Sequence, residues 1–412
     1  MSGRTSLFCP DAENAMTTTP ASLPTAARDI LARLVGFNVL SRQSNLALIE
    51  WVEQYLDAYG VSHERIPSDD GERFNLLARI GPDVADGVVL SGHTDVVPVE
   101  GQNWQSDPFT LTERDGRLYG RGSCDMKGFL ACALSGVPEW SRRDLKRPIW
   151  LAFSYDEEIG CLGAPRMIKH LIAHHSTPSA VIVGEPTLMA PVILQKGITT
   201  LKTVVHGVPS HSSQVNQGIS AIHVAARLVS HIEDIMSELA EEGHLNDAFN
   251  VPHSSLHVGT IHGGNAINIM AQHCEFDWEI RHLPEEGFEA VYNRFREYSD
   301  ELEKTLKTVN ADFAIETTTL TDTVPGLENR ANDQAMALLE RLGVCEEGQA
   351  VAYATEAGQF QQAGLQAVIC GPGSIEQAHR ADEFISLEQL ERGEHFMQML
   401  GPIMAGSSCS GH

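Results

Sequence analysis

The chain has 412 residues, 42% of them hydrophobic and 20% charged, a composition typical of a folded globular protein rather than of a disordered chain. Its 29 basic and 55 acidic residues give a formal net charge of −26, which disfavours nucleic acid and anionic membrane surfaces as partners. Because one compact core rarely extends over so long a chain, we expect two domains or one large domain with an insertion.

The ends of the chain and its cysteines indicate a cytoplasmic protein. Residues 1–22 and 406–412 are rich in small and polar residues and are predicted to be flexible tails. No stretch reaches the ~20 apolar residues of a membrane span, and the N-terminus lacks the apolar core of a signal peptide. Eight cysteines without C-x-x-C spacing form no disulfide framework in a chain of this length, so we expect reduced thiols.

Helices and strands are predicted to alternate over the first half of the chain. Apolar residues at helical spacing predict two helices between residues 24 and 59. Short apolar runs then predict strands at FNLLARIG, GVVLSGHTDVV, PIWLAFSY and AVIVGEP. Helices are predicted between them at about 126–140 and 163–174. This alternation favours a doubly wound α/β sheet.

The pattern changes at about residue 196. A strand (TTLKTVVHG), a helix at about 219–239, two strands (SSLHVGTIHGG and HCEFDWEIRHLP) and a helix at about 286–308 predict a compact α+β insert. After ADFAIETTTL, a helix at 333–341, the strand AVICG and a helix at 387–400 restore the α/β pattern. We therefore predict a catalytic domain with a doubly wound mixed sheet in two parts, 23–195 and 315–405, interrupted by a smaller α+β domain at 196–314.

Histidine and carboxylate side chains gather in the segments that follow the predicted strands. In open α/β sheets ligands bind at the carboxyl ends of the strands, and the GRGSCDMKG turn is too polar and flexible to belong to a core. The residues in question are His93, Asp95, Asp125, Glu157, Glu158, Glu185 and His379.

Each of these residues has an ordinary structural explanation on its own, as a helix cap, a solvated acid or a histidine bonded to a carbonyl. Their joint placement at the ends of successive strands favours a functional site instead. Histidine nitrogen and carboxylate oxygen without thiolate suit a catalytic pair of Zn²⁺, Co²⁺ or Mn²⁺ ions better than a structural zinc. The sequence therefore predicts metal-assisted hydrolysis.

These segments also carry a family resemblance. HTDVVP, GRGSCDMKG, DEEIGCLGA, GEPT, SHSS, GGNAINI and GPGSIEQAH match, in order, the dinuclear zinc aminoacylase and carboxypeptidase family, over residues 24–403. Through ATEAGQFQQAG and CGPGSIEQAHRADEF the chain most resembles the branch of the family that hydrolyses N2-acetyl-L-ornithine. The resemblance implies a cytoplasmic homodimer that holds two Zn²⁺ per subunit, with Co²⁺ as a substitute, and acts on a small N-acyl amino acid.

The resemblance also implies a role for each metal ligand. Asp125 is expected to bridge the two metals, with His93 and Glu185 on one metal and Glu158 and His379 on the other.

Two further residues of this region gain roles from the resemblance. Glu157 is expected to be the general base, which takes a proton from the attacking water and passes it to the leaving amine. Asp95 is expected to orient the ring of His93.

The insert and the last loop supply the remaining expectations. The resemblance implies that the 196–314 domain is the dimerisation domain and lid. It implies that His211 of the partner subunit completes the active site, with Asn268 beside it. It also implies that Arg281 binds the substrate carboxylate, and we place Gly373 among the substrate contacts. Without the resemblance these residues would be read as surface groups and turn residues.

Three functions stay open on sequence grounds. The first is hydrolysis of N2-acetyl-L-ornithine to ornithine and acetate, a step of arginine biosynthesis. The second is action on another N-acyl amino acid or a dipeptide, because desuccinylases and carboxypeptidases of the family share the ligands, base and arginine. The third is a metal-binding homologue without catalysis, which the presence of Glu157 and all five ligands disfavours.

Overall fold

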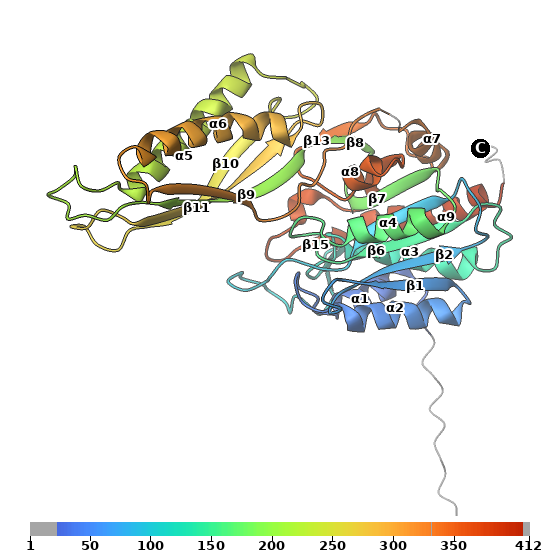
Figure 1. Ribbon diagram of the computed structural model, residues 1–412. Helices are drawn as coiled ribbons and strands as arrows, with labels where there is room; N and C mark the ends of the chain where they lie inside the picture. Colours follow the sequence, from blue (N-terminus) through green and yellow to red (C-terminus); the bar gives the residue numbers. More distant parts are fainter. Residues whose placement is uncertain (1–22, 331, 407–412) are drawn as a thin grey trace, which may run out of the picture.

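The computed structural model describes residues 23–330 and 332–406. The predicted tail 1–22, and the tail 406–412 apart from Gly406, lie outside the described residues. Figure 1 shows two lobes, a larger one built on a sheet with helices on both sides and a smaller one that extends away from it. None of the helices in residues 23–330 and 332–406 is long and apolar enough to cross a membrane.

The larger lobe contains an eight-stranded mixed sheet. Its strand order is β1-β2-β6-β3-β7-β14-β8-β13. The strands are β1 (Ser62–Pro67), β2 (Phe74–Ile80), β3 (Val88–His93), β6 (Ile149–Ser154), β7 (Ala180–Pro186), β8 (Val192–Gln195), β13 (Gln349–Val351) and β14 (Ala367–Gly371). The four central strands, β6, β3, β7 and β14, run parallel, and all their residues are buried, as expected for strands covered on both faces.

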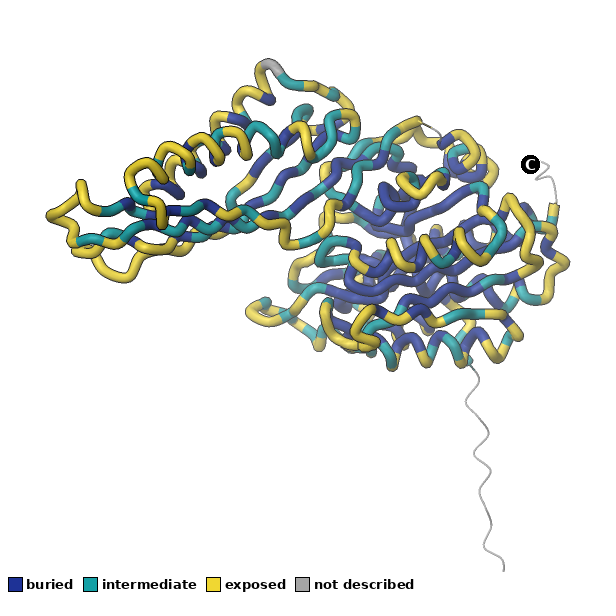
Figure 2. Tube along the Cα trace, in the orientation of Figure 1, coloured by how far each residue is buried: buried dark blue, intermediate teal, exposed yellow. Residues whose placement is uncertain are grey.

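Helices cover the two faces of this sheet. On one face α1 (Ala27–Val35), α2 (Leu46–Ala58), α3 (Lys127–Trp140), α7 (Asp333–Arg341) and α9 (Leu387–Met404) pack in one apolar cluster with alternate strand residues such as Leu90 and Leu151. On the other face α4 (Ala164–His174) and α8 (Ala357–Gln362) pack against residues such as Val89 and Ala152. Figure 2 shows the buried strands between the two layers. The prediction of a doubly wound mixed sheet is confirmed.

The smaller lobe is a four-stranded antiparallel sheet covered by two helices. The strand order is β10-β11-β9-β12, formed by β9 (Gly197–His206), β10 (Ser255–Gly263), β11 (His273–His282) and β12 (Ala314–Thr319). Alternate residues of β9 are buried against α5 (Ala221–Glu242) and α6 (Phe288–Lys307). β12 pairs with β9, so the predicted boundary at 314/315 falls within the first residues of a strand of this sheet. The division into domains stays a prediction.

A third sheet of three short strands joins distant parts of the larger lobe. It is formed by β4 (Thr112–Arg114), β5 (Arg117–Tyr119) and β15 (Phe384–Ser386), in the order β15-β5-β4. β5 lies just before the GRGSCDMKG turn, and β15 follows the segment 379–383. Their pairing therefore brings the turn that contains Asp125 next to the loop that contains His379. A single turn of 3₁₀ helix, η1 (Ile375–Gln377), lies within that loop.

Candidate active site

Three neighbouring parallel strands present the predicted site at their carboxyl ends. His93 is the last residue of β3, Glu185 is the sixth of the seven residues of β7, and Glu157 and Glu158 follow β6 after a short turn. Since β3 lies between β6 and β7, these side chains meet at one edge of the sheet, the edge at which open α/β sheets bind ligands.

Asp125 lies at the centre of the cluster, between the two histidines. Its Oδ1 is 3.1 Å from His93 Nε2, and its Oδ2 is 3.3 Å from His379 Nε2. His93 Nε2 is also 3.8 Å from Glu185 Oε1, and His379 Nε2 is 2.8 Å from Glu158 Oε2. The structure thus brings together all five predicted metal ligands, in two halves that share the Asp125 carboxylate.

The donor set fits metal ions. Glu185 Oε1 is buried and has no hydrogen-bond partner among the described residues, which is costly for a carboxylate oxygen unless a cation binds it. His93 Nδ1 donates its hydrogen to the main-chain oxygen of Asp95 at 2.9 Å. In this tautomer Nε2 carries no hydrogen, and its lone pair, on the side of Asp125 and Glu185, can bind a metal ion. The side chain of His379 is 53% exposed, so the cluster is open to solvent on that side.

The charges in the cluster also favour bound cations. Burial, together with the charges of Asp125 and Glu157, raises the pKa of Glu185 well above its ordinary value. Burial and the charge of Asp125 raise the pKa of Glu158 to about 7. Hydrogen bonds to Asp125 and Glu158 raise the pKa of His379 to about 10. Buried carboxylates this close together repel one another, and bound cations remove that repulsion.

Glu157 lies beside the five predicted ligands. A carboxylate oxygen of Glu157 lies within 4.8 Å of the facing ligand atoms of His93 and Glu185. Its Oε1 accepts a hydrogen bond from Cys161 Sγ at 3.3 Å. Burial and the neighbouring charge of Glu158 raise its pKa well above the ordinary value, against the opposing effect of His93. A carboxylate with a raised pKa at the edge of such a cluster suits proton transfer.

Asp95 has contacts that differ from the predicted ones. Its carboxylate is 3.7 Å from His93 Nδ1, which donates to the Asp95 main-chain oxygen instead. The carboxylate accepts hydrogen bonds from Ser41 Oγ at 2.8 Å and from the amides of Glu157 at 3.1 Å and Glu158 at 3.4 Å. Asp95 therefore positions the turn that contains the expected base and one of the ligands.

Glu383 was not found by sequence reasoning. Its buried carboxylate accepts from the amides of Gly122, Cys124 and Asp125 at 2.9 to 3.0 Å and from Arg121 Nη1 at 2.7 Å. It thus satisfies the main-chain donors of the turn that places Asp125.

Glu356 is a second buried carboxylate that sequence reasoning missed. It accepts from the hydroxyls of Ser91, at 2.9 Å, and Ser154, which lie on the neighbouring strands β3 and β6. In sequence both glutamates resemble surface acids. The position of Glu383 would have followed only from the pairing of β15 with β5, since Glu383 directly precedes β15.

Two other predicted residues lie at the edges of this region. Arg281, on β11, pairs with Glu279 at 2.8 Å and donates to the main-chain oxygen of Ala352 at 3.2 Å. Gly373 has a φ of +95°, and a Cβ at this position would lie 2.5 Å from Cys124 Sγ. Its amide donates to Gln389 Oε1 at 3.1 Å. The assignment of both residues to substrate binding stays a prediction.

His211 and Asn268 lie together but apart from the cluster of their own chain. The Asn268 carbonyl accepts from the Ser212 amide at 3.0 Å, and His211 forms a β-bridge with Ile269. β9 starts two residues after β8 ends, and its ten residues carry the chain roughly 33 Å from the large sheet. The loop 207–220, which holds His211, therefore lies at the far end of the smaller lobe (Figure 1).

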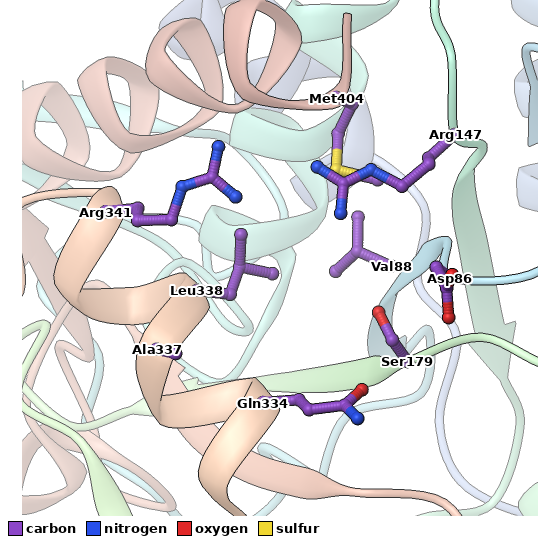
Figure 3. Close-up of a pocket in the computed structure, with 9 residues that line it drawn as sticks. All are labelled: Asp86, Val88, Arg147, Ser179, Gln334, Ala337, Leu338, Arg341 and Met404. Carbon is purple, nitrogen blue, oxygen red and sulfur yellow. The ribbon is translucent and has the colours of Figure 1, made fainter. Parts of the chain in front are cut away.

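A separate pocket of about 360 Å³ lies at the opposite end of the same strands. It is bordered by Val88, at the start of β3, and by Ser179, just before β7. Figure 3 shows the guanidinium groups of Arg147 and Arg341 directed into it. It shares no lining residue with the histidine–carboxylate cluster and is therefore a feature separate from it.

A doubly wound α/β sheet with a histidine–carboxylate cluster at the carboxyl ends of its strands has the arrangement of a metal-dependent hydrolase. Residues 89–400 match the model of Peptidase family M20/M25/M40, and the chain belongs to this family. It is 35% identical to an acetylornithine deacetylase of Pasteurella multocida over 372 residues, which are 90% of this chain and 93% of the relative.

Solved structures show the same fold. A tripeptidase of Staphylococcus aureus superposes with a TM-score of 0.72 at 19% identity, over 92% of this chain and 98% of its own. A dinuclear metal-binding peptidase of the M20 family from Bacillus subtilis superposes with a TM-score of 0.63 at 15% identity, over 92% and 98%.

Proposed function

We propose that the chain hydrolyses N2-acetyl-L-ornithine to L-ornithine and acetate. The observation that supports this most is the 35% identity to an acetylornithine deacetylase along nearly the full length of both chains. The cluster of His93, Asp125, Glu158, Glu185 and His379 supplies the chemistry that such a reaction needs. The expected location is the cytoplasm, the compartment that the sequence favours.

Two Zn²⁺ ions per subunit, with Co²⁺ as a substitute, are the proposed cofactors. Asp125 would bridge them, with His93 and Glu185 on one and Glu158 and His379 on the other, in agreement with the two halves of the cluster. When bound, such ions polarise a carbonyl oxygen and lower the pKa of a coordinated water molecule. This assignment places three ligands on each metal and leaves room for substrate and water.

Glu157 is the proposed proton carrier. It takes one proton from water as the hydroxide oxygen adds to the acetyl carbon, and it returns this proton to the ornithine nitrogen as the carbon–nitrogen bond breaks. Asp95 would support this role because its carboxylate holds the amides of Glu157 and Glu158.

The active site is proposed to be completed by a second copy of the chain. His211, at the far end of the smaller lobe, would stabilise the oxyanion in the site of the partner subunit, and Asn268 beside it would contact the substrate there. The smaller lobe exposes apolar side chains that a dimer contact would cover: Val215, Ile222, Ile261, Ile267 and Ile269. Exposed apolar groups in one region are typical of an interface.

Arg281 is proposed to bind the substrate carboxylate. Its guanidinium contacts the Ala352 carbonyl, one residue before Tyr353. Burial and the charges of Glu185 and Asp125 raise the pKa of Tyr353, so this segment borders the cluster. A substrate carboxylate would replace Glu279 as the bidentate partner of Arg281.

A panel of substrates tests the proposed function. The metal-loaded enzyme would be assayed with acetylornithine, succinyl-diaminopimelate, acetylmethionine, acetylglutamate and a dipeptide, and the kcat/KM values compared. We expect acetylornithine to give the highest value. A clear preference for another compound would replace the proposed substrate and leave amide hydrolysis in place.

A further inference from the structure

A second group of metal-binding side chains lies outside the active site, where α4 ends beside β1. Glu64 is on β1, His170 is in the last turns of α4, and His175 follows that helix. Glu64 Oε2 is 2.7 Å from His170 Nε2, and Glu64 Oε1 is 2.7 Å from His175 Nε2. One carboxylate thus lies between two imidazole rings, and all three side chains are only partly exposed.

Both ring nitrogens of His175 face carboxylates. Nε2 faces Glu64 at 2.7 Å, and Nδ1 faces Asp83 Oδ2 at 3.1 Å. A neutral imidazole has a single N–H, so it can donate to only one of two carboxylate acceptors. With a neutral ring, one of the two nitrogens therefore faces a carboxylate oxygen with no hydrogen between them, and a metal ion bound at that nitrogen would remove this repulsive contact.

The surroundings hold His175 and Asp83 in place. Asp83 pairs with Arg79 at 2.5 Å, and its other oxygen accepts from the Ser176 amide at 3.1 Å. The ring of His175 packs on Trp150 with centroids 4.7 Å apart. A histidine that ligates a metal ordinarily donates its other N–H to a carboxylate or carbonyl, and Asp83 supplies this partner.

The carboxylate of Glu64 is placed to bind an ion together with both histidines. Its two oxygens face different imidazole nitrogens, Oε2 that of His170 and Oε1 that of His175, each at 2.7 Å. A single ion placed among these three side chains would therefore meet a carboxylate oxygen and both ring nitrogens.

The group is separate from the catalytic cluster. The turn that holds Glu157 leads into the start of α4 at Ala164, whereas His170 and His175 lie toward and beyond its end. The 11 residues of α4 span roughly 16 Å. A change at His175 can therefore leave the catalytic ligands in place.

We propose that Glu64, His170 and His175 bind a late first-row divalent cation such as Zn²⁺, Co²⁺ or Ni²⁺. Two imidazole nitrogens and a carboxylate suit these ions, with water completing the coordination. His175 binds the ion through Nε2 and donates Nδ1–H to Asp83, so a neutral ring satisfies both carboxylates. The ion ties the end of α4 to the edge strand β1.

Metal content measured after equilibrium dialysis against Zn²⁺ tests this site. Wild type is expected to hold one more ion per chain than the variant His170→Ala/His175→Ala, and Glu64→Gln is expected to lose the same ion. His63→Ala is the matched control, because His63 neighbours Glu64 but pairs with Asp57 instead, and it should keep the wild-type content. Equal metal content in wild type and the double variant would show that these residues bind no ion, and would overturn the proposal.

Tryptophan fluorescence gives an independent measurement with Co²⁺ or Ni²⁺ added to enzyme already loaded with Zn²⁺ at the catalytic site. Because Trp150 packs on His175, we expect quenching in wild type that is absent from Trp150→Phe and from His170→Ala/His175→Ala. Identical quenching in the double variant would contradict the site. Turnover should be unchanged in the double variant, so failure of this proposal is distinguishable from failure of the proposed function.

Discussion

Asp125 is the residue on which both histidines of the active site converge, and its own position depends on Glu383. The buried Glu383 carboxylate binds three main-chain amides of the turn 122–125 and the Arg121 guanidinium. A buried carboxylate that accepts from this many donors is costly to remove, because all of these donors then lose their partner away from water.

Glu383→Ala is expected to lower the free energy of unfolding by about 3–5 kcal/mol and to weaken metal binding, since the turn that places Asp125 loses its acceptor. Denaturant unfolding and metal content after dialysis would measure the two effects. Glu388→Ala is the control, because Glu388 lies five residues further on and is exposed. A Glu383→Ala protein as stable as the control would show that the turn 122–125 keeps its conformation without the Glu383 carboxylate.

Glu157→Gln is expected to keep its metal content and lose about a hundredfold to ten-thousandfold in kcat, the usual contribution of a general base. The amide keeps the size of the side chain but cannot carry the proton. Glu100→Gln, at an exposed position, serves as the control in the same assay. Full turnover in Glu157→Gln would remove Glu157 from the mechanism.

At the scale of elements, β3, β6 and β7 bring the site together, and close packing against α3 sets the position of β7. Gly184 precedes Glu185, one of the proposed metal ligands. A Cβ at Gly184 would lie 2.0 Å from the Phe129 ring of α3, so only glycine allows this approach of helix and strand.

Gly184→Ala is expected to cost roughly 1–3 kcal/mol of stability, as overpacked cores do, and to reduce turnover because Glu185 shifts with its strand. Thermal unfolding and an activity assay would measure both. In Gly259→Ala, on β10, the nearest atom to the new Cβ lies 3.9 Å away, and both properties should stay at wild-type values. Wild-type stability and turnover in Gly184→Ala would mean that α3 can shift to make room for the new methyl group without cost.

The elements also show which parts of the molecule the sequence can predict. The central strands and their helices carry long apolar patterns, so the predictions for β3, β6, β7, α3 and α4 are confirmed. The edge strand β1 was missed because SHERIP is largely polar. The short β8 and β13 were missed because they are defined by pairing with distant segments.

Within the site as well, residues that follow a locally recognisable element could be predicted, and residues placed by distant contacts could not. The segments that contain His93, Asp125, Glu158, Glu185 and His379 follow strands or a glycine-rich turn, and this position along the chain is visible in sequence. The partners of Glu383 and Glu356 come from segments about 200 to 260 residues away. No local pattern separates such buried acids from surface acids, so only the folded chain identifies them.

At the scale of the whole molecule, the smaller lobe carries His211 away from the cluster of its own chain. β9 leads outward, and β10 runs in the same direction, because both are antiparallel to β11. The loops that hold His211 and Asn268 therefore share the far end of the lobe, and a symmetric dimer could bring them to the partner's cluster.

Mixed dimers test this arrangement. Co-expressed His211→Ala and Glu157→Gln chains should recover about a quarter of the wild-type rate on random pairing, because half the dimers are mixed and each has one intact site. Each variant alone should be nearly inactive. Absence of recovery in mixtures that contain mixed dimers would show that His211 acts within its own chain.

We propose that the histidine–carboxylate cluster holds two metal ions and that amide hydrolysis requires them. Metal-free protein would be titrated with Zn²⁺ in the His170→Ala/His175→Ala background, which removes the second proposed site, while acetylornithine hydrolysis is followed. We expect no turnover without metal and a rise in activity that ends at two ions per chain. Full activity in the metal-free protein, or a plateau that does not depend on added metal, would contradict it.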